Sequence, residues 1–355
     1  MKSILILSMY GDLAASSRQR VVQYLDVLEE NMYDIRVEPL FPNEYLENIF
    51  SKKKSSIIKI LYWYLKRFYF VTTSSKYDLI WIQYELFPQL PSIFESLILS
   101  FNENFILDFD DAIFHKYDLW GNSVTKFFLG TKLELLCSKA KVIVCGNDYI
   151  RDWAKQFCQC TELIPTVINF DKYNSYKKEK LNESLVIGWI GSPATWLYMN
   201  PLIKVLEDLS KIYDFQVLIV GSGHDYKKLE NFKFKTWKED SEISDIYEMD
   251  IGIMPLFDDP WALGKCGYKL IQYMACGKPV IASPVGVNCN IVEDGVNGLF
   301  ASSEEDWKTA IITLVSDKKL RDNMGIAGSH KVQVNFSLQS TTPALLKLIK
   351  GLIDV

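Results

Sequence analysis

The chain has 355 residues, of which 48% are apolar and 23% are charged, and its formal net charge is −5. This length suits two domains of ordinary size, and the composition is that of a well-packed globular protein rather than a disordered or fibrous one. The nearly balanced charge argues against nucleic acid as a partner.

The seven cysteines are scattered along the chain, and none occurs in a C-x-x-C pair. Their spacing argues against a zinc cluster and against a disulfide framework, and it favours a reducing compartment. The apolar run Ile4–Leu7 is too short for the core of a signal peptide, so we expect a buried strand there. No stretch reaches the ~18 consecutive apolar residues that a membrane-spanning helix needs. We therefore expect a cytoplasmic protein.

Short apolar runs alternate with longer helical patterns in both halves of the chain. The runs are continuous, which indicates strands covered by helices on both faces, and the alternation of strand and helix gives a parallel sheet. The expected strands are Ile4–Leu7, Leu79–Gln83, Phe105–Asp108, Val142–Cys145, Val186–Ile190, Val217–Val220, Ile251–Met254 and Val280–Ala282.

The strand pattern closes at Ile164-Pro165 and begins again at Leu185, after a polar stretch rich in lysine. The sequence thus predicts an α/β protein with two Rossmann-like, doubly wound domains that face each other across a cleft. The predicted parts are a first domain at 1–168, a linker at 169–184, a second domain at 185–336, and a C-terminal helix at 337–355 that returns to the first domain.

A loop of small residues follows the first predicted strand and opens a helix, at the end of the strand where a polar ligand would bind. Ser16 and Arg18 lie in this loop, and Arg20 follows two residues later. Side chains two apart on a helix diverge, so only one of the two arginines faces the cleft. We expect that one to be Arg18, with Ser16 beside it, although an arginine on the open surface fits the pattern equally well.

Residues 51–76 contain seven basic residues and no acidic one, interleaved with isoleucine, leucine and aromatic residues. This pattern fits a helix that lies on an anionic membrane surface, where it would bring the protein to a lipid-linked acceptor. Burial in the core explains the aromatic residues equally well. Single-stranded nucleic acid also binds basic aromatic patches, but the acidic remainder of the chain argues against it.

Three carboxylates, Asp108, Asp110 and Asp111, fall within four residues at the end of a predicted strand. Like charges this close raise each other's pKa unless cations or hydroxyl donors compensate. The spelling D-x-D also occurs by chance, so we do not interpret it as a metal–nucleotide motif. We expect these acids to bind acceptor or donor hydroxyls or to pair with Arg18, with His115 assisting unless it is purely structural.

The segment from Pro260 to Ser283 carries a glycine-containing loop, an amphipathic helix that ends at Gly277, and a strand. Lys265 and Lys269 lie at the start of this helix, where a cation opposes the helix dipole at a cost of roughly 0.3–1 kcal/mol each. Two interpretations are open: a solvated pair of lysines, or an anion such as a diphosphate held by backbone N–H groups between them.

The end of this segment resembles the family 4 retaining glycosyltransferases, in which a Glu-x7-Glu stretch closes on Met-Ala-Cys-Gly-x-Pro-Val. Met274–Val280 matches that tail, and Gly286 and Glu293–Leu299 match family residues downstream of it. The similarity covers most of Leu185–Leu314 and extends more weakly over the first domain. It implies the two-domain GT-B fold.

The chain departs from the family at both glutamates, whose positions hold Gly264 and Gln272. The second glutamate usually holds the nucleotide ribose, and Gln272 can replace it only as a neutral amide. The first usually contacts the donor sugar, and Asp258 or Asp259 is the nearest possible substitute.

A second departure comes after the strand Val186–Ile190, where the family commonly has an arginine and a lysine for the diphosphate. This chain has only Gly191, Ser192 and Thr195 there, for phosphate contact or ordinary helix capping. We infer that the positive charge has moved to Lys265 and Lys269, which resembles a bacterial subgroup with a Gly-Lys-x-Gly-x-Lys pattern that includes Gly267. Trp237 lies where the family places its base-contacting loop, though packing explains a lone tryptophan as well.

The resemblance implies a retaining transferase that moves a sugar from a UDP- or GDP-sugar to a glycan or a lipid-linked acceptor, as in the synthesis of bacterial surface polysaccharide or lipopolysaccharide. The reaction would use no protein nucleophile, no metal and no other cofactor. Lys265 and Lys269 would stabilise the charge on the leaving diphosphate, and Asp110 would complete the catalytic set.

Two alternatives remain open at this point. A nucleotide-sugar epimerase has the same architecture, and the loss of both family glutamates is compatible with an inactive sugar-binding or scaffold subunit. A nicotinamide oxidoreductase is disfavoured because no G-x-G-x-x-G lies between a strand and a helix.

Overall fold

The computed structural model of the protein describes residues 1–51, 53–119, 121–176, 184–223 and 229–354. Two compact units share the chain. Unit 1 consists of Met1–Thr166, Gly264–Cys266 and Thr341–Val355, and unit 2 consists of Val167–Leu263 and Gly267–Ser340. Neither unit is a single continuous segment of the chain.

Unit 1 is built on a six-stranded parallel sheet in the order β2-β1-β3-β4-β5-β6. The two central strands, β3 and β4, are buried along their whole length. The strands are β1 (Lys2–Leu7), β2 (Tyr33–Val37), β3 (Leu79–Gln83), β4 (Phe105–Phe109), β5 (Val142–Cys145) and β6 (Thr161–Leu163).

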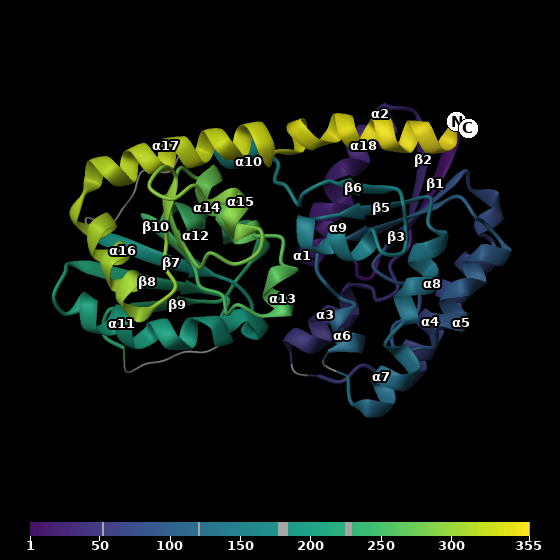
Figure 1. Cartoon of the computed structure of the whole chain (residues 1–355), viewed down its shortest axis with the longest axis horizontal. Coiled ribbons are helices and arrows are strands. Elements are labelled where there is room, and N and C mark those ends of the chain that lie inside the picture. The colour runs from purple at the N-terminus through teal and green to yellow at the C-terminus, as the bar shows by residue number, and fades with distance from the viewer. Residues whose placement is uncertain (52, 120, 177–183, 224–228, 355) are drawn as a thin grey trace. The chain divides into compact units, whose positions relative to one another are not determined.

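Helices cover both faces of the unit 1 sheet, with α4, α8 and α9 packed in the main apolar cluster on one side. On the other side, α18 (Leu338–Ile353) lies alongside α2 (Figure 1). The helices before it are α1 (Ala15–Arg20), η1 (Val22–Tyr24), α2 (Leu25–Glu30), α3 (Asn43–Phe50), α4 (Ile57–Thr72), η2 (Ser74–Lys76), α5 (Ser92–Glu95), η3 (Ser96–Ser100), α6 (His115–Asp118), α7 (Ser123–Leu129), α8 (Lys132–Lys139) and α9 (Asp148–Ala154).

The last residues of the chain complete the core of unit 1. Tyr24 and Thr341 share a hydrogen bond of 2.9 Å between their hydroxyl oxygens, and Asn104 Nδ2 donates to the carbonyl of Leu352 at 3.1 Å. Leu345 and Ile349 on the same helix are fully buried. Unit 1 thus includes the C-terminal helix from Thr341 onward.

Unit 2 also has a six-stranded parallel sheet, in the order β12-β11-β10-β7-β8-β9. This is the doubly wound Rossmann order, in which the first strand lies at the centre and the chain then builds outward on both sides. The strands are β7 (Leu185–Ile190), β8 (Phe215–Val220), β9 (Phe232–Lys235), β10 (Ile251–Met254), β11 (Val280–Ala282) and β12 (Gly298–Phe300).

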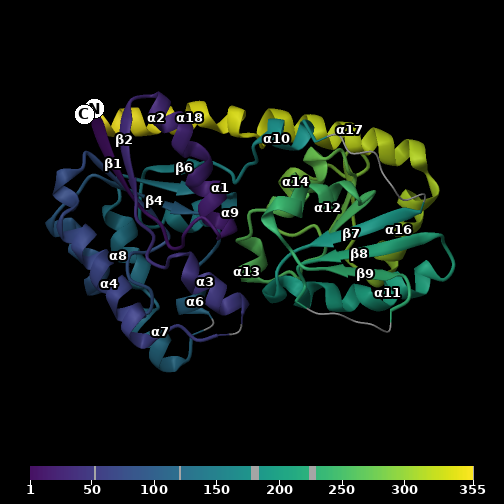
Figure 2. The ribbon, with the colours of Figure 1, turned by 180° about the vertical axis from the view of Figure 1, so that it is seen from behind.

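Two apolar clusters lie on opposite faces of the unit 2 sheet, one under α10, α12, α14 and α15 and the other under α11 and α16. Figure 2 shows α10, α12 and α14 together on one side of β7 and β8, with α11 on the other. The helices are α10 (Phe170–Asn174), η4 (Pro193–Met199), α11 (Asn200–Ser210), η5 (Glu239–Ser241), α12 (Glu242–Tyr247), α13 (Pro260–Leu263), α14 (Tyr268–Ala275), α15 (Asn288–Ile291), α16 (Glu304–Ser316) and α17 (Lys318–Asn335).

All eight predicted strands are present, and the α/β class with two doubly wound parallel sheets is confirmed. Four strands were not predicted, and they are the two edge strands of each sheet: β2, β6, β9 and β12. In the predicted linker, residues 170–174 form α10, whose Phe170 and Tyr173 are buried in unit 2, while residues 177–183 lie outside the described residues. Among the described residues, no helix has the length and apolarity to cross a bilayer.

A buried ion pair joins α1 to the middle of the unit 1 sheet. Arg20 Nη2 donates to Asp108 Oδ1 at 2.6 Å, Trp81 Nε1 donates to Asp108 Oδ2 at 3.2 Å, and Arg20 Nη1 donates to the carbonyl of Ile164 at 2.7 Å. Pairing with Arg18 was one of two expectations for the acids, and for Asp108 it was wrong: the partner is Arg20, which is on the buried face of α1, whereas Arg18 is not. Arg18 Nη1 donates to backbone carbonyls of its own loop.

We expect Arg20→Met to destabilise unit 1 by roughly 3–5 kcal/mol, because it leaves the Asp108 carboxylate buried without its counter-charge. Arg18→Met is the matched control and should cost about 1 kcal/mol or less, since Arg18 is partly exposed and its guanidinium donates to backbone carbonyls at the surface. Hydrogen exchange of the β4 amides, followed by mass spectrometry, measures both. Equal losses in the two variants would contradict a stabilising role for the pair.

Candidate functional site

The carboxyl end of β7 is the natural place for a ligand in unit 2. β7 pairs with β8 on one side and with β10 on the other, so the connections after these strands leave in opposite directions. Doubly wound sheets bind ligands in the crevice that this reversal opens. Residues of the loops after β7, β8 and β9 and of α14 converge at this point.

Lys269, the second residue of α14, reaches the loop that follows β7. Its Nζ lies 4.5 Å from the ring centre of Trp189 in β7 and donates to Thr195 Oγ1 at 3.3 Å. A Cβ atom placed on Gly191 would lie 2.8 Å from the same Nζ, so a side chain there would compete with the ammonium for space. The structure therefore brings together Lys269, Gly191 and Thr195, although Lys269 and Thr195 are 74 residues apart in the sequence.

The start of α14 is fixed by Gly267. Its φ of +67° is left-handed, and a Cβ atom would lie 2.3 Å from Ile291 Cδ1 and 2.9 Å from Val287 Cγ1. Both the conformation and the lack of space require glycine. Gly277, with φ +68°, ends the same helix as predicted.

The loops after β7, β8 and β9 touch one another. A Cβ atom on Gly221 would lie 2.2 Å from the carbonyl oxygen of Gly191 and 3.0 Å from Trp237 Cβ. Ser192 and Thr195 form a capping box at the start of η4, in which Ser192 N donates to Thr195 Oγ1 at 3.1 Å. These two residues therefore cap a helix here, and a contact with phosphate remains a prediction.

Gln272 and Trp237 meet at one carboxylate. Gln272 is 3% exposed, and its Nε2 donates to Glu242 Oε1 at 2.6 Å, while Trp237 Nε1 donates to Glu242 Oε2 at 2.8 Å. The sequence had placed both residues near the nucleotide but held no signal for Glu242. The structure shows that they belong to one network beside Lys269.

Lys265 belongs to the short segment 264–266, which packs with unit 1. Its backbone carbonyl accepts a hydrogen bond of 3.0 Å from Asn147 Nδ2. A Cβ atom on Gly264 would lie 2.2 Å from Ala112 Cβ, which explains why the family glutamate has no place here. Asp259 accepts from the amide of Ala262 and thereby caps α13.

Asp110, just after β4, is 3% exposed and accepts a hydrogen bond from the Tyr84 hydroxyl. Burial and the neighbouring Asp111 charge raise the pKa of Asp110 to about 7, against the opposing effects of Arg20 and Tyr84. Tyr84 itself has a φ of +67°, which is unusual for a residue with a large side chain. A titratable group of this kind at a strand end is typical of a functional site.

The remaining predicted residues of unit 1 have different surroundings. Ser16 and Asp111 are partly exposed. His115 is 7% exposed, and its two ring nitrogens contact Asp118 Oδ1 at 2.9 Å and Tyr149 Oη at 2.8 Å. These contacts explain His115 as a structural residue, and binding of a ligand by any of the three remains a prediction.

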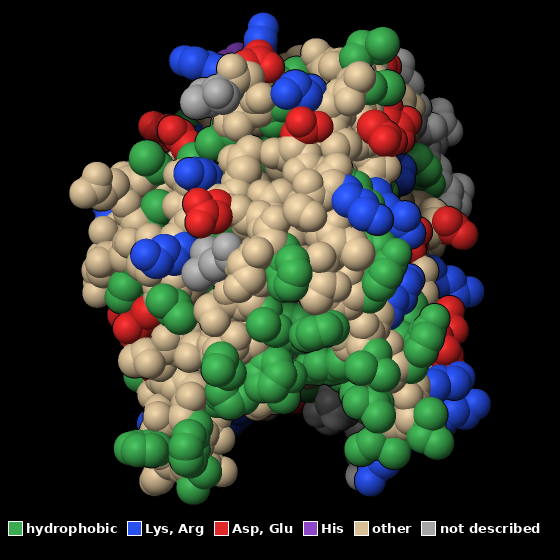
Figure 3. Space-filling model, turned by 90° about the vertical axis from the view of Figure 1, so that its right-hand side faces the viewer, with side chains coloured by type: hydrophobic (Ala, Val, Ile, Leu, Met, Phe, Trp, Pro, Cys, Tyr) green, Lys and Arg blue, Asp and Glu red, His purple; other side chains and the backbone are tan. Residues whose placement is uncertain are grey.

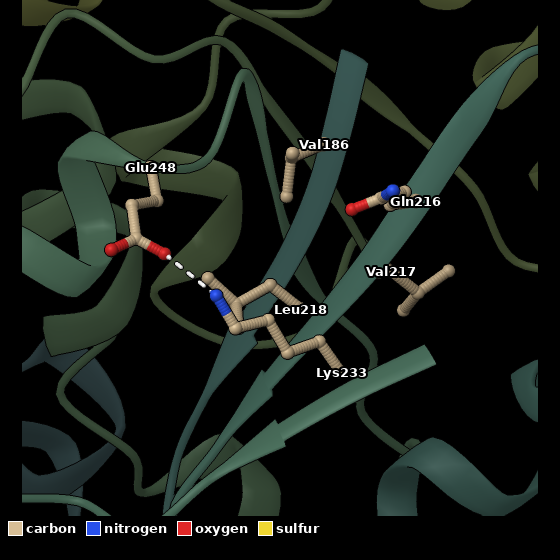
Figure 4. A pocket seen from close by; sticks show the side chains of 6 residues that line it. All are labelled: Val186, Gln216, Val217, Leu218, Lys233 and Glu248. Carbon is tan, nitrogen blue, oxygen red and sulfur yellow. Dashed lines mark ion pairs between the residues drawn. The ribbon is translucent and has the colours of Figure 1, made fainter. Parts of the chain in front are cut away.

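A small pocket lies on the unit 2 sheet, toward the amino ends of the strands and thus away from the end that Lys269 reaches (Figure 4). It opens beside the ion pair of Lys233 and Glu248, whose Nζ and Oε2 are 3.6 Å apart. Because it lies toward the amino ends of β7 and β8, we do not assign it to the functional site. Its lining consists of Val186, Gln216, Val217, Leu218, Lys233 and Glu248.

The sequence analysis preferred Arg18 to Arg20, and it missed Tyr84, Tyr173 and Glu242. Arg20 had a usable signal, because Ser17, Arg20 and Tyr24 recur at helical spacing and all three are buried. Glu242 had none, since two of its three partners, Gln272 and Tyr173, are 30 and 69 residues away in the sequence.

The Asp110 carboxyl gives a prediction about stability and pH. Its raised pKa means that, between about pH 4 and 7, the folded state keeps a proton that the unfolded chain has released, so the free energy of unfolding falls as the pH rises. Asp110→Asn removes this dependence. We expect the variant to gain stability relative to the wild type by about 1.4 kcal/mol for each pH unit in that window.

Hydrogen exchange of the β4 amides at several pH values measures this difference, and Asp34→Asn in the exposed part of β2 controls for the loss of one carboxylate. A difference that stays constant from pH 5 to pH 8 would contradict the assignment.

Known proteins similar to this chain point to one family. Residues 171–331 match the family model described as glycosyl transferases group 1. Over 339 residues the chain is 23% identical to an uncharacterised glycosyltransferase of Methanocaldococcus jannaschii, in a match that covers 89% of this chain and 83% of that protein.

Solved structures share the fold of the whole chain. Sucrose-phosphate synthase from Thermosynechococcus elongatus aligns with a TM-score of 0.73 at 17% identity, covering 100% of both chains. HepE of Anabaena, in complex with UDP, aligns with a TM-score of 0.68 at 15% identity, covering 99% of this chain and 100% of that chain. The chain has the GT-B fold of these glycosyltransferases, and residues 171–331, in its second unit, match the glycosyl transferases group 1 family.

Proposed function

We propose that the protein transfers a sugar, with retention of anomeric configuration, from a UDP- or GDP-sugar to a glycan or a lipid-linked acceptor of surface-polysaccharide or lipopolysaccharide synthesis. The proposal that a nucleotide sugar is the donor rests on one observation: the Lys269 ammonium lies beside Gly191 and Thr195 at the carboxyl end of β7. A cation, a side-chain-free loop and the first turn of α14 together suit a diphosphate. The Anabaena structure in complex with UDP makes UDP the first nucleotide to test.

In the proposed reaction, the bond between the sugar C1 and the diphosphate oxygen breaks while the acceptor oxygen bonds to C1 on the same face. The proton of the acceptor hydroxyl passes to the departing phosphate oxygen, so no protein nucleophile is required. Lys269 stabilises the negative charge that develops on the diphosphate, and we propose the same role for Lys265. Because the lysines supply this positive charge, the reaction needs no metal ion.

We propose that unit 1 provides the acceptor side, with Asp110, Asp111, Ser16 and Arg18 as the polar residues that bind hydroxyls. Asp110 is the most specific of these. Its pKa of about 7 lets it donate or accept a hydrogen bond near neutral pH, and Tyr84 fixes its orientation.

Helix α4 supports a membrane contact of unit 1. Its inner face buries Trp63, Phe70, Val71 and even Arg67. Its opposite face, the outer stripe, is apolar although it is exposed, with side chains that are 43–80% accessible. The outer stripe consists of Ile57, Ile58, Leu61, Tyr62, Leu65, Phe68 and Tyr69.

Ile93 and Phe94 of α5 are exposed apolar side chains of unit 1 as well. Figure 3 shows hydrophobic side chains gathered over the lower half of this face of unit 1, with lysines and arginines along one flank. Exposed patches of this kind mark interaction sites. Residues 51–76 have no acidic side chain, and five of their basic side chains are exposed in the described residues, whereas Arg67 is buried. We therefore propose an anionic bilayer surface as the partner. Residue 52 lies outside the described residues, and Lys59 and Lys66 pair with Glu44 and Glu38.

The donor site is tested by Lys269→Ala. We expect turnover to fall roughly 100- to 1,000-fold, with folding unchanged in thermal melting, because the variant loses charge stabilisation that acts mainly in the transition state. Lys233→Ala, at the pocket on the far end of the strands, is the control and should retain full activity. Near-normal transfer and donor hydrolysis in Lys269→Ala would refute the role.

The same assays separate the alternatives. Incubation with the donor alone converts the sugar if the protein is an epimerase. Calorimetry that detects no binding of UDP or GDP would favour an inactive scaffold.

The membrane contact is tested by flotation with vesicles that contain or lack anionic lipid. We expect Leu61→Glu/Leu65→Glu to lower the partition coefficient on anionic vesicles at least ~10-fold, since both residues are in the outer stripe and each change adds a charge that the lipid repels. Ile326→Glu, an equally exposed change on α17 of unit 2, should leave binding unaltered. Equal binding of wild type and double variant, or no preference for anionic lipid, would rule out this partner.

A further inference from the structure

Glu242, the first residue of α12, accepts hydrogen bonds from three other segments of unit 2. Gln272 Nε2 donates to its Oε1 at 2.6 Å, Trp237 Nε1 donates to its Oε2 at 2.8 Å, and Tyr173 Oη donates to its Oε1 at 3.3 Å. Gln272 Nε2 also donates to Tyr173 Oη at 2.9 Å, and both of these residues are buried. The carboxylate is therefore held in one orientation, while Glu242 itself is only partly buried.

This carboxylate lies beside the site of the Lys269 ammonium. Lys269 and Gln272 are three residues apart on α14, so their side chains are neighbours on one face of the helix. Trp237, the other hydrogen-bond donor to Glu242, lies next to Gly221 in the loop after β8, and Gly221 in turn lies next to the carbonyl of Gly191 in the loop after β7. A ligand whose diphosphate contacts Lys269 thus has its next group within reach of Glu242.

The geometry also explains why position 272 is glutamine. A carboxylate at 272 would face Glu242 Oε1 at hydrogen-bond distance, and the repulsion would force one of the two acids to take up a proton. A neutral amide that donates to Glu242 avoids this conflict. The glutamine on α14 is therefore the residue that suits the carboxylate on α12.

We infer that Glu242 binds the hydroxyls of the donor's ribose, with Gln272, Trp237 and Tyr173 as its positioning residues. The inference rests on the proposed function, because the ribose arrives with the nucleoside diphosphate. A carboxylate can accept hydrogen bonds from two adjacent hydroxyls, and doubly wound nucleotide sites commonly combine a diphosphate loop with one acidic residue for the ribose.

The test is a comparison of UDP with 2′-deoxy-UDP and 3′-deoxy-UDP by calorimetry, on the wild type and on Glu242→Gln, with the guanosine series used instead if GDP binds more tightly. For the wild type, removal of a ribose hydroxyl should weaken binding roughly 10-fold or more. Glu242→Gln should bind UDP more weakly than the wild type by a similar factor, and it should bind the deoxy analogues nearly as well as it binds UDP. If the loss of affinity from UDP to the deoxy analogues is the same in both proteins, the inference is overturned.

Two further variants keep the test decisive. If Glu242→Gln fails to fold, Glu242→Asp retains the charge but withdraws the carboxylate by one methylene. It should likewise reduce the deoxy penalty, which is the factor by which the deoxy analogues bind more weakly than UDP. An unchanged penalty in Glu242→Asp also overturns the inference. Glu248→Gln is the matched control, because it removes another carboxylate of unit 2 that pairs with Lys235 at 2.7 Å. It should bind UDP within about twofold of the wild type.

Failure of this inference can be distinguished from failure of the proposed function. Absence of UDP and GDP binding in the wild type would refute the proposed donor site itself. Binding that depends on Lys269 but has the same deoxy penalty with and without Glu242 would refute only the ribose contact.

Discussion

Both sheets are covered by helices on their two faces, and this burial dictates where chemistry can occur. A polar side chain in the middle of β3, β4, β10 or β11 would lie in an apolar core without water. Polar residues are accordingly found at the carboxyl ends of the strands, as Gln83 and Asp108 are, or in the loops just beyond them. The candidate residues of both units obey this constraint.

Within that constraint, Lys269 is held at an unfavourable place by its neighbours. The first turn of a helix repels a cation by roughly 0.3–1 kcal/mol, whereas an ammonium over an indole ring gains about 0.5–2 kcal/mol. Trp189 and the Thr195 hydroxyl therefore offset the dipole of α14 before any anion arrives. The same residues keep the ammonium beside Gly191, so the proposed diphosphate would meet a cation that is already in position.

The sequence predicted the interior of each sheet better than its borders. Interior strands have continuous apolar runs because both of their faces are buried, but β2, β6, β9 and β12 are partly exposed and lack such runs. At the site, sequence motifs located Lys269 and Gly191 because each lies in a recognisable local pattern. They could not reveal Glu242 or the pairing of Arg20 with Asp108, since those contacts join segments 30 and 88 residues apart.

The division of unit 1 between the two ends of the chain has a consequence for biosynthesis. Leu345 and Ile349 are part of its core, and Thr341 and Leu352 bond to Tyr24 and Asn104. During translation, the N-terminal 166 residues emerge long before these partners exist. The part of the sheet face that α18 covers then stays exposed until the ribosome has made that helix, so the nascent chain is open to aggregation and to chaperones for much of its synthesis.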